Sequence, residues 1–215
     1  MIIRDPRAVI ASANHGRYFD TVGNRYPLLM LIRLWRKSAA YWYAYRNEPL
    51  VKAIRYEDLI QYPVDTLREV ARWLDVSPFP EGLIHQPLRD HAGKFWRGNS
   101  SFGDKSKVDV SSKEAWQNIL SQDAIRFIEA CTKPELTLLG YSLSTNPERN
   151  AIADFIDDVS GVRESYLSLY ALSQENRKIE LRRWDAAETG RYVFTNNERL
   201  FLFPEIYSDV NIHRG

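Results

Sequence analysis

The stretch Met1-Ile2-Ile3-Arg4-Asp5-Pro6-Arg7-Ala8-Val9-Ile10-Ala11-Ser12 decides the fold class. Three apolar residues lead directly into Arg4-Asp5-Pro6, an order typical of a buried strand that passes into a helix. Asp5 suits the N-cap, and a proline is favoured in the first turn, where its missing N–H has no helical partner. We therefore expect a strand–helix junction of an α/β sheet, in a chain that begins partway through a larger fold.

Apolar spacing predicts the remaining elements. Helical regions are expected over 26–46, 57–74, 112–131 and 147–187. Pro63 is expected to divide the second of these, because proline disrupts a helix interior. A second strand is expected over 50–56, and a β-hairpin over 191–203.

Charge and cysteine content exclude several classes of protein. The 215 residues carry 29 Lys+Arg and 28 Asp+Glu, a formal net charge of +1. This balance lacks the basic field of non-specific nucleic-acid binding, so no nucleic-acid partner is expected. The single cysteine, Cys131, forms no internal disulfide and fits a reducing compartment, so we expect a cytoplasmic location. Neither a membrane span nor a metal site is expected, since apolar runs are short and no cluster has metal-ligand spacing.

Arg4 and Ser12 are candidate phosphate ligands. Arg4 follows the expected strand and can contact a phosphate through two N–H groups, while the helix N-terminus beside it offers backbone N–H groups. Ser12 lies eight positions after Arg4, just over two helical turns, and can face the same side. The alternative is an Arg4 paired with a carboxylate and a Ser12 without a role.

Two further segments have the same ambiguity. In Arg55-Tyr56-Glu57-Asp58-Leu59, the tyrosine can stack on a purine or donate to a phosphate, or the segment can simply start a helix. Between 76 and 112 the periodicity is lost, and Arg97-Gly98-Asn99 can either fold over an anion as a backbone nest or form solvated turns.

Aromatic residues are dense between Trp35 and Tyr45. Trp35 and Trp42 are seven positions apart and therefore share one helix face. Core packing explains such a face, and an aromatic wall of a ligand pocket is the alternative.

Together and in this order, the segments resemble the sulfotransferases that use 3′-phosphoadenosine 5′-phosphosulfate (PAPS). The resemblance rests on the Arg4/Ser12 spacing, the Arg-Tyr-Glu-Asp-Leu segment, the basic glycine-containing loop Arg97-Gly98-Asn99, a following helix with an early Trp116, and a terminal Leu139-Gly140-Tyr141. It spans residues 1–142. It implies a helix-rich α/β protein with a P-loop-like three-layer fold, incomplete in this chain. Residues 143–215 would form a helical and β-hairpin appendage.

The resemblance also implies functional roles. Arg4 and Ser12 would hold the 3′-phosphate of PAPS or of its product, 3′-phosphoadenosine 5′-phosphate (PAP). Tyr56 would lie near the adenine or the same phosphate, and Arg97 and Gly98 would close over it. The acceptor would be a hydroxyl or amine of a small molecule, lipid or carbohydrate, and a homodimer is one expectation.

Two parts of the family pattern are not found in the sequence. The Pro-Lys-Ser-Gly-Thr-type loop for the phosphosulfate is missing, and Gly103-Asp104-Lys105-Ser106 does not replace it because no strand precedes it. The usual catalytic base, which precedes the Arg-Asp-Pro junction in the family, is also not found. No catalytic residue is therefore assigned, and a truncated chain is expected. The alternatives are a non-catalytic interaction module or another P-loop-like nucleotide enzyme, such as a kinase relative.

Overall fold

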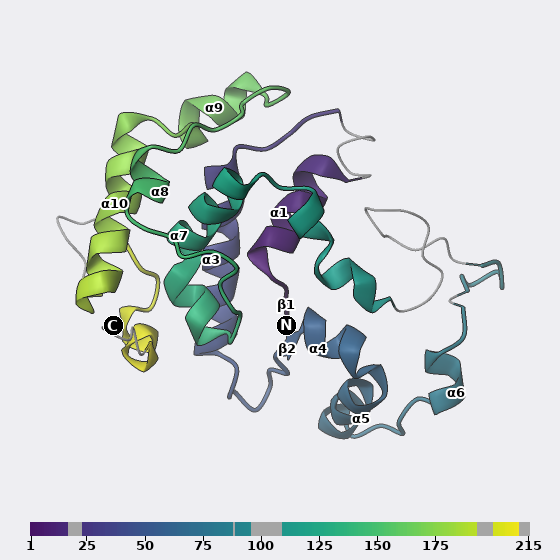
Figure 1. Cartoon of the computed structure of the whole chain (residues 1–215). Helices are drawn as coiled ribbons and strands as arrows, with labels where there is room; N and C mark the ends of the chain where they lie inside the picture. Colours follow the sequence, from purple (N-terminus) through teal and green to yellow (C-terminus); the bar gives the residue numbers. More distant parts are fainter. Residues whose placement is uncertain (17–22, 88, 96–108, 193–199, 211–215) are drawn as a thin grey trace.

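The computed structural model describes residues 1–16, 23–87, 89–95, 109–192 and 200–210. Strands β1 (Ile2–Ile3) and β2 (Ile54–Arg55) form a parallel pair, with Ile2 opposite Ile54 and Ile3 opposite Arg55. Helices connect the two strands, and most of the remaining chain is helical (Figure 1). The parallel pair with its helical crossover confirms the α/β class.

The first helix starts as the sequence predicts. Helix α1 (Pro6–His15) has Asp5 as its N-cap, and the Asp5 carboxylate accepts the Arg7 backbone N–H at 2.8 Å. Helix α3 (Leu28–Ala44) confirms the long helix and buries Leu29, Ile32 and Trp35. The two helices pack against each other beside β1 (Figure 1).

Pro63 divides the next helical region as expected. Helix α4 (Tyr56–Gln61) starts directly after β2, and helix α5 (Pro63–Leu74) begins at the proline. The short helix α6 (Glu81–Ile84) follows. Helices α5 and α6 lie on the side of the molecule away from α9 (Glu164–Tyr170) and α10 (Gln174–Thr189) (Figure 1).

The predicted helix over 112–131 is wrong at its start. Residues 110–118 form two 3₁₀ turns, η1 (Val110–Lys113) and η2 (Ala115–Asn118), and helix α7 runs over Gln122–Leu138. The side chain of Ser121 accepts the Ala124 N–H, and this cap starts α7 later than the apolar pattern suggests.

The C-terminal part contains helices α8 (Asn150–Ala153), α9 (Glu164–Tyr170) and α10 (Gln174–Thr189) and the 3₁₀ turn η3 (Pro204–Asp209). The predicted β-hairpin is wrong where it can be judged: residues 191–192 and 200–203 are not strand, and 193–199 lie outside the described residues. The Leu200 carbonyl accepts from Arg183 of α10, and Phe201 packs against Tyr192 and Tyr207. Tertiary contacts therefore replace a strand ladder there.

The C-terminal helices share the core of the N-terminal part. One cluster joins Ile10, Ile32 and Phe127 to Phe155 and Trp184. A second cluster surrounds Ile3 and includes Trp35, Leu136 and Tyr141.

Buried charges also connect α10 to the rest of the fold. Glu180 pairs with Arg33 and Arg36 of α3, and Arg183 pairs with Glu135 of α7. Burial alone would raise the pKa of Glu180, but the surrounding arginines, Arg36 first, hold it below its ordinary value.

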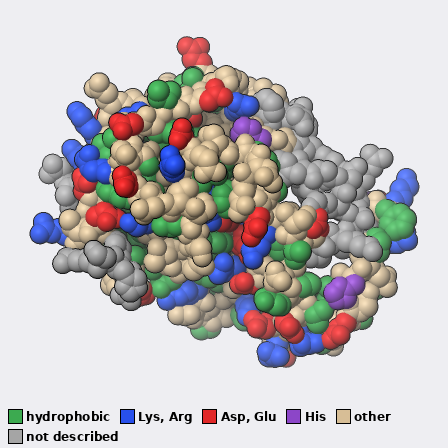
Figure 2. Space-filling model, viewed as in Figure 1, with side chains coloured by type: hydrophobic (Ala, Val, Ile, Leu, Met, Phe, Trp, Pro, Cys, Tyr) green, Lys and Arg blue, Asp and Glu red, His purple; other side chains and the backbone are tan. Residues whose placement is uncertain are grey.

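One face of the molecule is mixed in charge. On the face shown in Figure 2, acidic and basic side chains alternate rather than forming patches of one sign. None of the helices in the described part of the chain is both long and apolar enough to span a bilayer.

Candidate functional site

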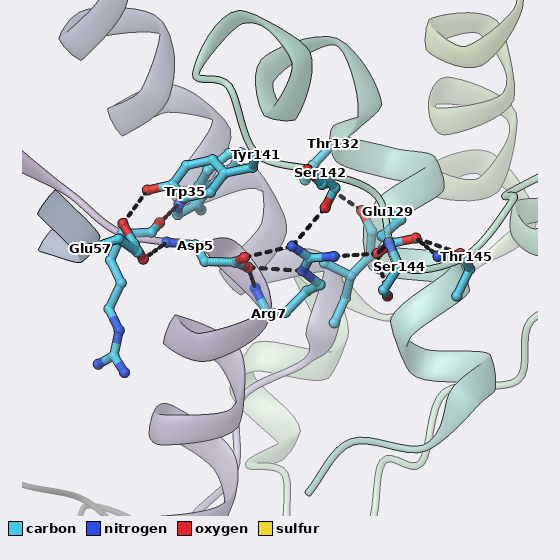
Figure 3. A network of polar contacts seen from close by, with 12 residues as sticks. Asp5, Arg7, Trp35, Glu57, Glu129, Thr132, Tyr141, Ser142, Ser144 and Thr145 are labelled. Atoms are coloured by element: carbon cyan, nitrogen blue, oxygen red, sulfur yellow. Dashed lines mark hydrogen bonds and ion pairs between the residues drawn. The ribbon is translucent and has the colours of Figure 1, made fainter. Parts of the chain in front are cut away.

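The candidate site lies where β1 passes into α1. Two side chains from other elements form hydrogen bonds with the backbone of this junction. The Trp35 indole N–H donates to the Arg4 carbonyl at 2.7 Å, and the Asp5 N–H donates to the Glu57 carboxylate at 3.0 Å (Figure 3). Trp35 and Glu57 are both buried. The junction therefore has a fixed backbone from which the Arg4 side chain extends.

The Arg4 guanidinium is a cation without a carboxylate partner among the described residues. Its central carbon lies 4.5 Å from the centre of the Tyr56 ring, and one terminal nitrogen donates to the Ser112 carbonyl at 3.1 Å. Its Nε atom is buried and has no hydrogen-bond partner. A buried unsatisfied donor on an arginine is costly, and an anionic ligand would relieve it.

The structure thus brings together Arg4 and Tyr56, two of the five predicted site residues. Ser12 lies on α1, half-buried, and already takes part in a polar interaction. Its alignment with Arg4 stays a prediction. Arg97 and Gly98 lie outside the described residues, as does Gly103-Asp104-Lys105-Ser106.

The segment beside Arg4 is one that the sequence reasoning did not select. Turn η1 supplies the Ser112 carbonyl to Arg4, and it packs against α4, which starts at Tyr56. The composition of Ser111-Ser112-Lys113, with two hydroxyls and an ammonium group, is a signal that points to this segment, but both serine hydroxyls donate to Asp109 in the structure.

One expectation about the junction is wrong for two of its backbone N–H groups. The N-terminus of α1 was expected to offer free N–H groups to a phosphate, but the Asp5 N–H donates to Glu57 and the Arg7 N–H donates to Asp5. Pro6 has no N–H. Two carboxylates therefore occupy the positive end of this helix, and a phosphate here would depend on side chains such as Arg4.

Behind the junction, Arg7 is the centre of a buried ion network (Figure 3). Its guanidinium contacts the Asp5 carboxylate at 2.6 Å, the Ser142 carbonyl at 3.0 Å and the carboxylate of Glu129. Glu129 also accepts N–H and O–H groups from Ser144 and Thr145. Burial acts to raise the pKa of Glu129, but the hydrogen bonds from Thr145 and Ser144 outweigh it and lower that pKa.

A second network lies at the end of β2. The Tyr141 hydroxyl donates to the Glu57 carboxylate at 2.7 Å, and the Arg55 guanidinium lies over the Tyr141 ring at 4.4 Å. Burial, followed by the negative charge of Glu57, raises the pKa of Tyr141 far above its ordinary value. A cavity of about 330 Å³ opens here, lined in part by Arg55, Glu57, Lys113 and Tyr141.

The aromatic run of α3 packs against the protein itself. Trp42 donates its indole N–H to the Ile54 carbonyl, while Tyr41 and Tyr45 contact the ring of Phe203 edge-on. These contacts favour the packing explanation of the aromatic residues.

Within the described residues, no group of three or more His, Cys, Asp or Glu side chains is arranged to hold a metal ion.

A family model for the sulfotransferase domain matches residues 1–140. The match covers most of the chain, including β1, the Arg4 junction and α7, and the chain therefore belongs to the sulfotransferase family. This confirms the family resemblance. No curated protein and no solved structure shows a significant match to the chain.

Proposed function

We propose that this sulfotransferase-family chain binds the 3′-phosphorylated adenosine end of PAPS, and that the reaction it serves is sulfuryl transfer to a hydroxyl or amine of a small molecule, lipid or carbohydrate. The observation that carries the proposal is the position of the Arg4 guanidinium: it follows the carboxyl end of β1, lies over the Tyr56 ring and has no carboxylate partner among the described residues, while its buried Nε, like that of Arg55, has no hydrogen-bond partner. A 3′-phosphate is a dianion and distinguishes PAPS from AMP and ATP. An arginine guanidinium can donate two parallel hydrogen bonds to a phosphate and is therefore suited to recognise this dianion.

The chain's own residues have separable tasks in this proposal. Arg4 binds the 3′-phosphate, and Ser12 adds a hydroxyl donor from α1. Tyr56 supports the Arg4 guanidinium by stacking and lies where the adenine or the same phosphate can contact it. Arg97 and Gly98, which lie outside the described residues, would close over the 3′-phosphate. When bound, PAPS supplies the sulfuryl group and leaves as PAP.

The arrangement of the two strands also supports nucleotide binding at Arg4 and Tyr56. The parallel register of β1 and β2 and their helical crossover fit a P-loop-like three-layer arrangement, in which ligands bind beyond the carboxyl ends of parallel strands. Arg4 and Tyr56 follow those ends directly.

Calorimetric titration with PAP, AMP and ATP tests the proposal. We expect binding that requires the 3′-phosphate, so PAP should bind and AMP and ATP should bind much more weakly. Arg4→Ala should weaken PAP binding by at least about tenfold, the scale of one charge-assisted hydrogen bond. Equal affinity for the three nucleotides by the folded chain would refute the proposal.

Arg46 provides a matched control, because its guanidinium also lies over a tyrosine ring, 3.6 Å from the centre of Tyr43. Arg46→Ala removes the same charge and a similar stacking contact just beyond the C-terminal end of α3, together with a 4.0 Å ion pair to Asp209. We expect unchanged PAP affinity in this variant. A loss equal to that of Arg4→Ala would mean that only net charge matters.

A further inference from the structure

The contact between Arg4 and Tyr56 depends on two strands with a very short ladder. β1 and β2 pair over two residues each, and their register ends at Ile3 and Arg55. Beyond that point β2 turns into helix α4 at Tyr56, so its backbone no longer runs beside β1. The backbone hydrogen bonds of the ladder therefore do not extend to Arg4 and Tyr56, the residues proposed to bind the nucleotide.

A side chain continues the pairing where the backbone stops. Extending the register by two residues places Asp5 opposite Glu57. The Asp5 N–H donates to Glu57 Oε1 at 3.0 Å. In a longer ladder this N–H would donate to a backbone carbonyl of the neighbouring strand, so the Glu57 carboxylate takes the place of that carbonyl. Arg4 precedes Asp5 and Tyr56 precedes Glu57, so this one bond ties together the residues next to the stacked pair.

Tyr141 fixes the carboxylate that makes this bond. Its hydroxyl donates to Glu57 Oε2 at 2.7 Å, so each oxygen of Glu57 has its own donor. Glu57 and Tyr141 are only 4% and 8% exposed. The Tyr141 ring is held in turn by the Arg55 guanidinium and by packing beside Ile3 and Leu139. With both oxygens occupied and both side chains buried, the carboxylate has little freedom to rotate.

We infer that Glu57 and Tyr141 are positioning residues of the proposed nucleotide site, which hold Arg4 and Tyr56 in register by extending the β1–β2 ladder through a side chain. The inference rests on the proposed function for its nucleotide. Tyr141 belongs to the Leu139-Gly140-Tyr141 segment that follows α7, so a residue distant in sequence from both strands completes this arrangement.

The test compares two hydroxyl deletions. Tyr141→Phe removes the donor to Glu57, and Tyr207→Phe removes an equivalent donor, since the buried Tyr207 hydroxyl donates to Glu135 at 2.7 Å in another part of the fold. The readout is the ratio of the AMP and PAP dissociation constants, measured on the same sample. An unfolded fraction cancels in this ratio, so a partly unfolded variant still gives an answer.

We expect Tyr141→Phe to lower the preference for PAP about fivefold, the scale of one lost hydrogen bond, because PAP binding should weaken more than AMP binding. Tyr207→Phe should keep the wild-type ratio. Glu57→Leu removes both accepting oxygens at a similar side-chain size and should lower the ratio in the same direction. Hydrogen exchange at the Asp5 amide adds a second readout: it should be faster in Tyr141→Phe and unchanged in Tyr207→Phe.

The outcomes separate the two proposals. If the wild type prefers PAP and Tyr141→Phe keeps that preference, the inference is overturned and the proposed function stands. The same holds if both tyrosine variants lose the preference equally, because the effect would then be a general loosening. A wild type without preference for PAP refutes the proposed function and the inference with it.

Discussion

Replacement of Glu129 by glutamine should destabilise the fold strongly, although the two side chains have nearly the same size. The Glu129 side chain is completely buried and accepts from Arg7, from the N–H and hydroxyl of Ser144, and from the N–H and hydroxyl of Thr145. Glutamine keeps one accepting oxygen and replaces the other by a donating NH₂ group. At least one donor would then face another donor, and Arg7 would lose one of its two carboxylates.

The expected loss in the free energy of unfolding depends on the contacts that Arg7 keeps in the variant. Breaking a buried ion pair by removing one partner costs about 3–5 kcal/mol. Arg7 keeps its contact with the Asp5 carboxylate, so its charge is not left alone. We therefore expect the lower end of that range, about 3 kcal/mol near neutral pH.

The acid dependence provides an independent signature of Glu129. Because the folded protein holds the pKa of Glu129 below its ordinary value, the unfolded chain takes up this proton first as the pH falls. The contribution of Glu129 is present above the unfolded pKa of about 4.3 and is lost as the pH falls through the folded pKa. Glu129→Gln should remove this part of the acid sensitivity.

Urea unfolding of wild type and variant, followed by circular dichroism between pH 3 and 7, measures both effects. The control is Glu69→Gln, since Glu69 pairs with Lys52 at 3.0 Å but is largely exposed. Its urea midpoint should barely move, because exposed pairs contribute little. A Glu129→Gln variant within about 1 kcal/mol of wild type at pH 7 would show that the network is not held together as described.

Three smaller changes test other parts of the structure by the same unfolding assay. Ser121→Ala removes the N-cap of α7 and should cost about 1 kcal/mol; no loss would contradict the delayed start of this helix. Gly140→Ala should cost about 1–2 kcal/mol, because Gly140 has φ +68° and its added Cβ meets only the Arg55 Nη1 at 3.4 Å, so backbone strain dominates. Arg183→Met leaves the buried Glu135 without its cation and should cost about 3–5 kcal/mol, and a neutral result would argue that α10 does not depend on this pair.

Local features of the fold could be predicted from the sequence because they depend on residues that are close in the chain. The Asp5 cap acts on Arg7 two positions later, and Pro63 divides two helices by its own geometry. Arg4 and Tyr56 were recognisable because charged and aromatic residues at strand ends follow a simple pattern. The expected helix start near 112 failed for a local reason too, since the Ser121 cap competes with the apolar spacing.

The sequence by itself determined the strand–helix junction, its capping and the identity of a cation at its end. Only the tertiary structure decided how that cation is held: the carboxylate of Glu57 lies 52 positions from Asp5, and the hydroxyl of Tyr141 lies 84 positions from Glu57. Arg7 and Glu129 meet across 122 positions. Such pairs have no local signature, because a buried polar group takes whichever partner the packing of distant helices brings to it.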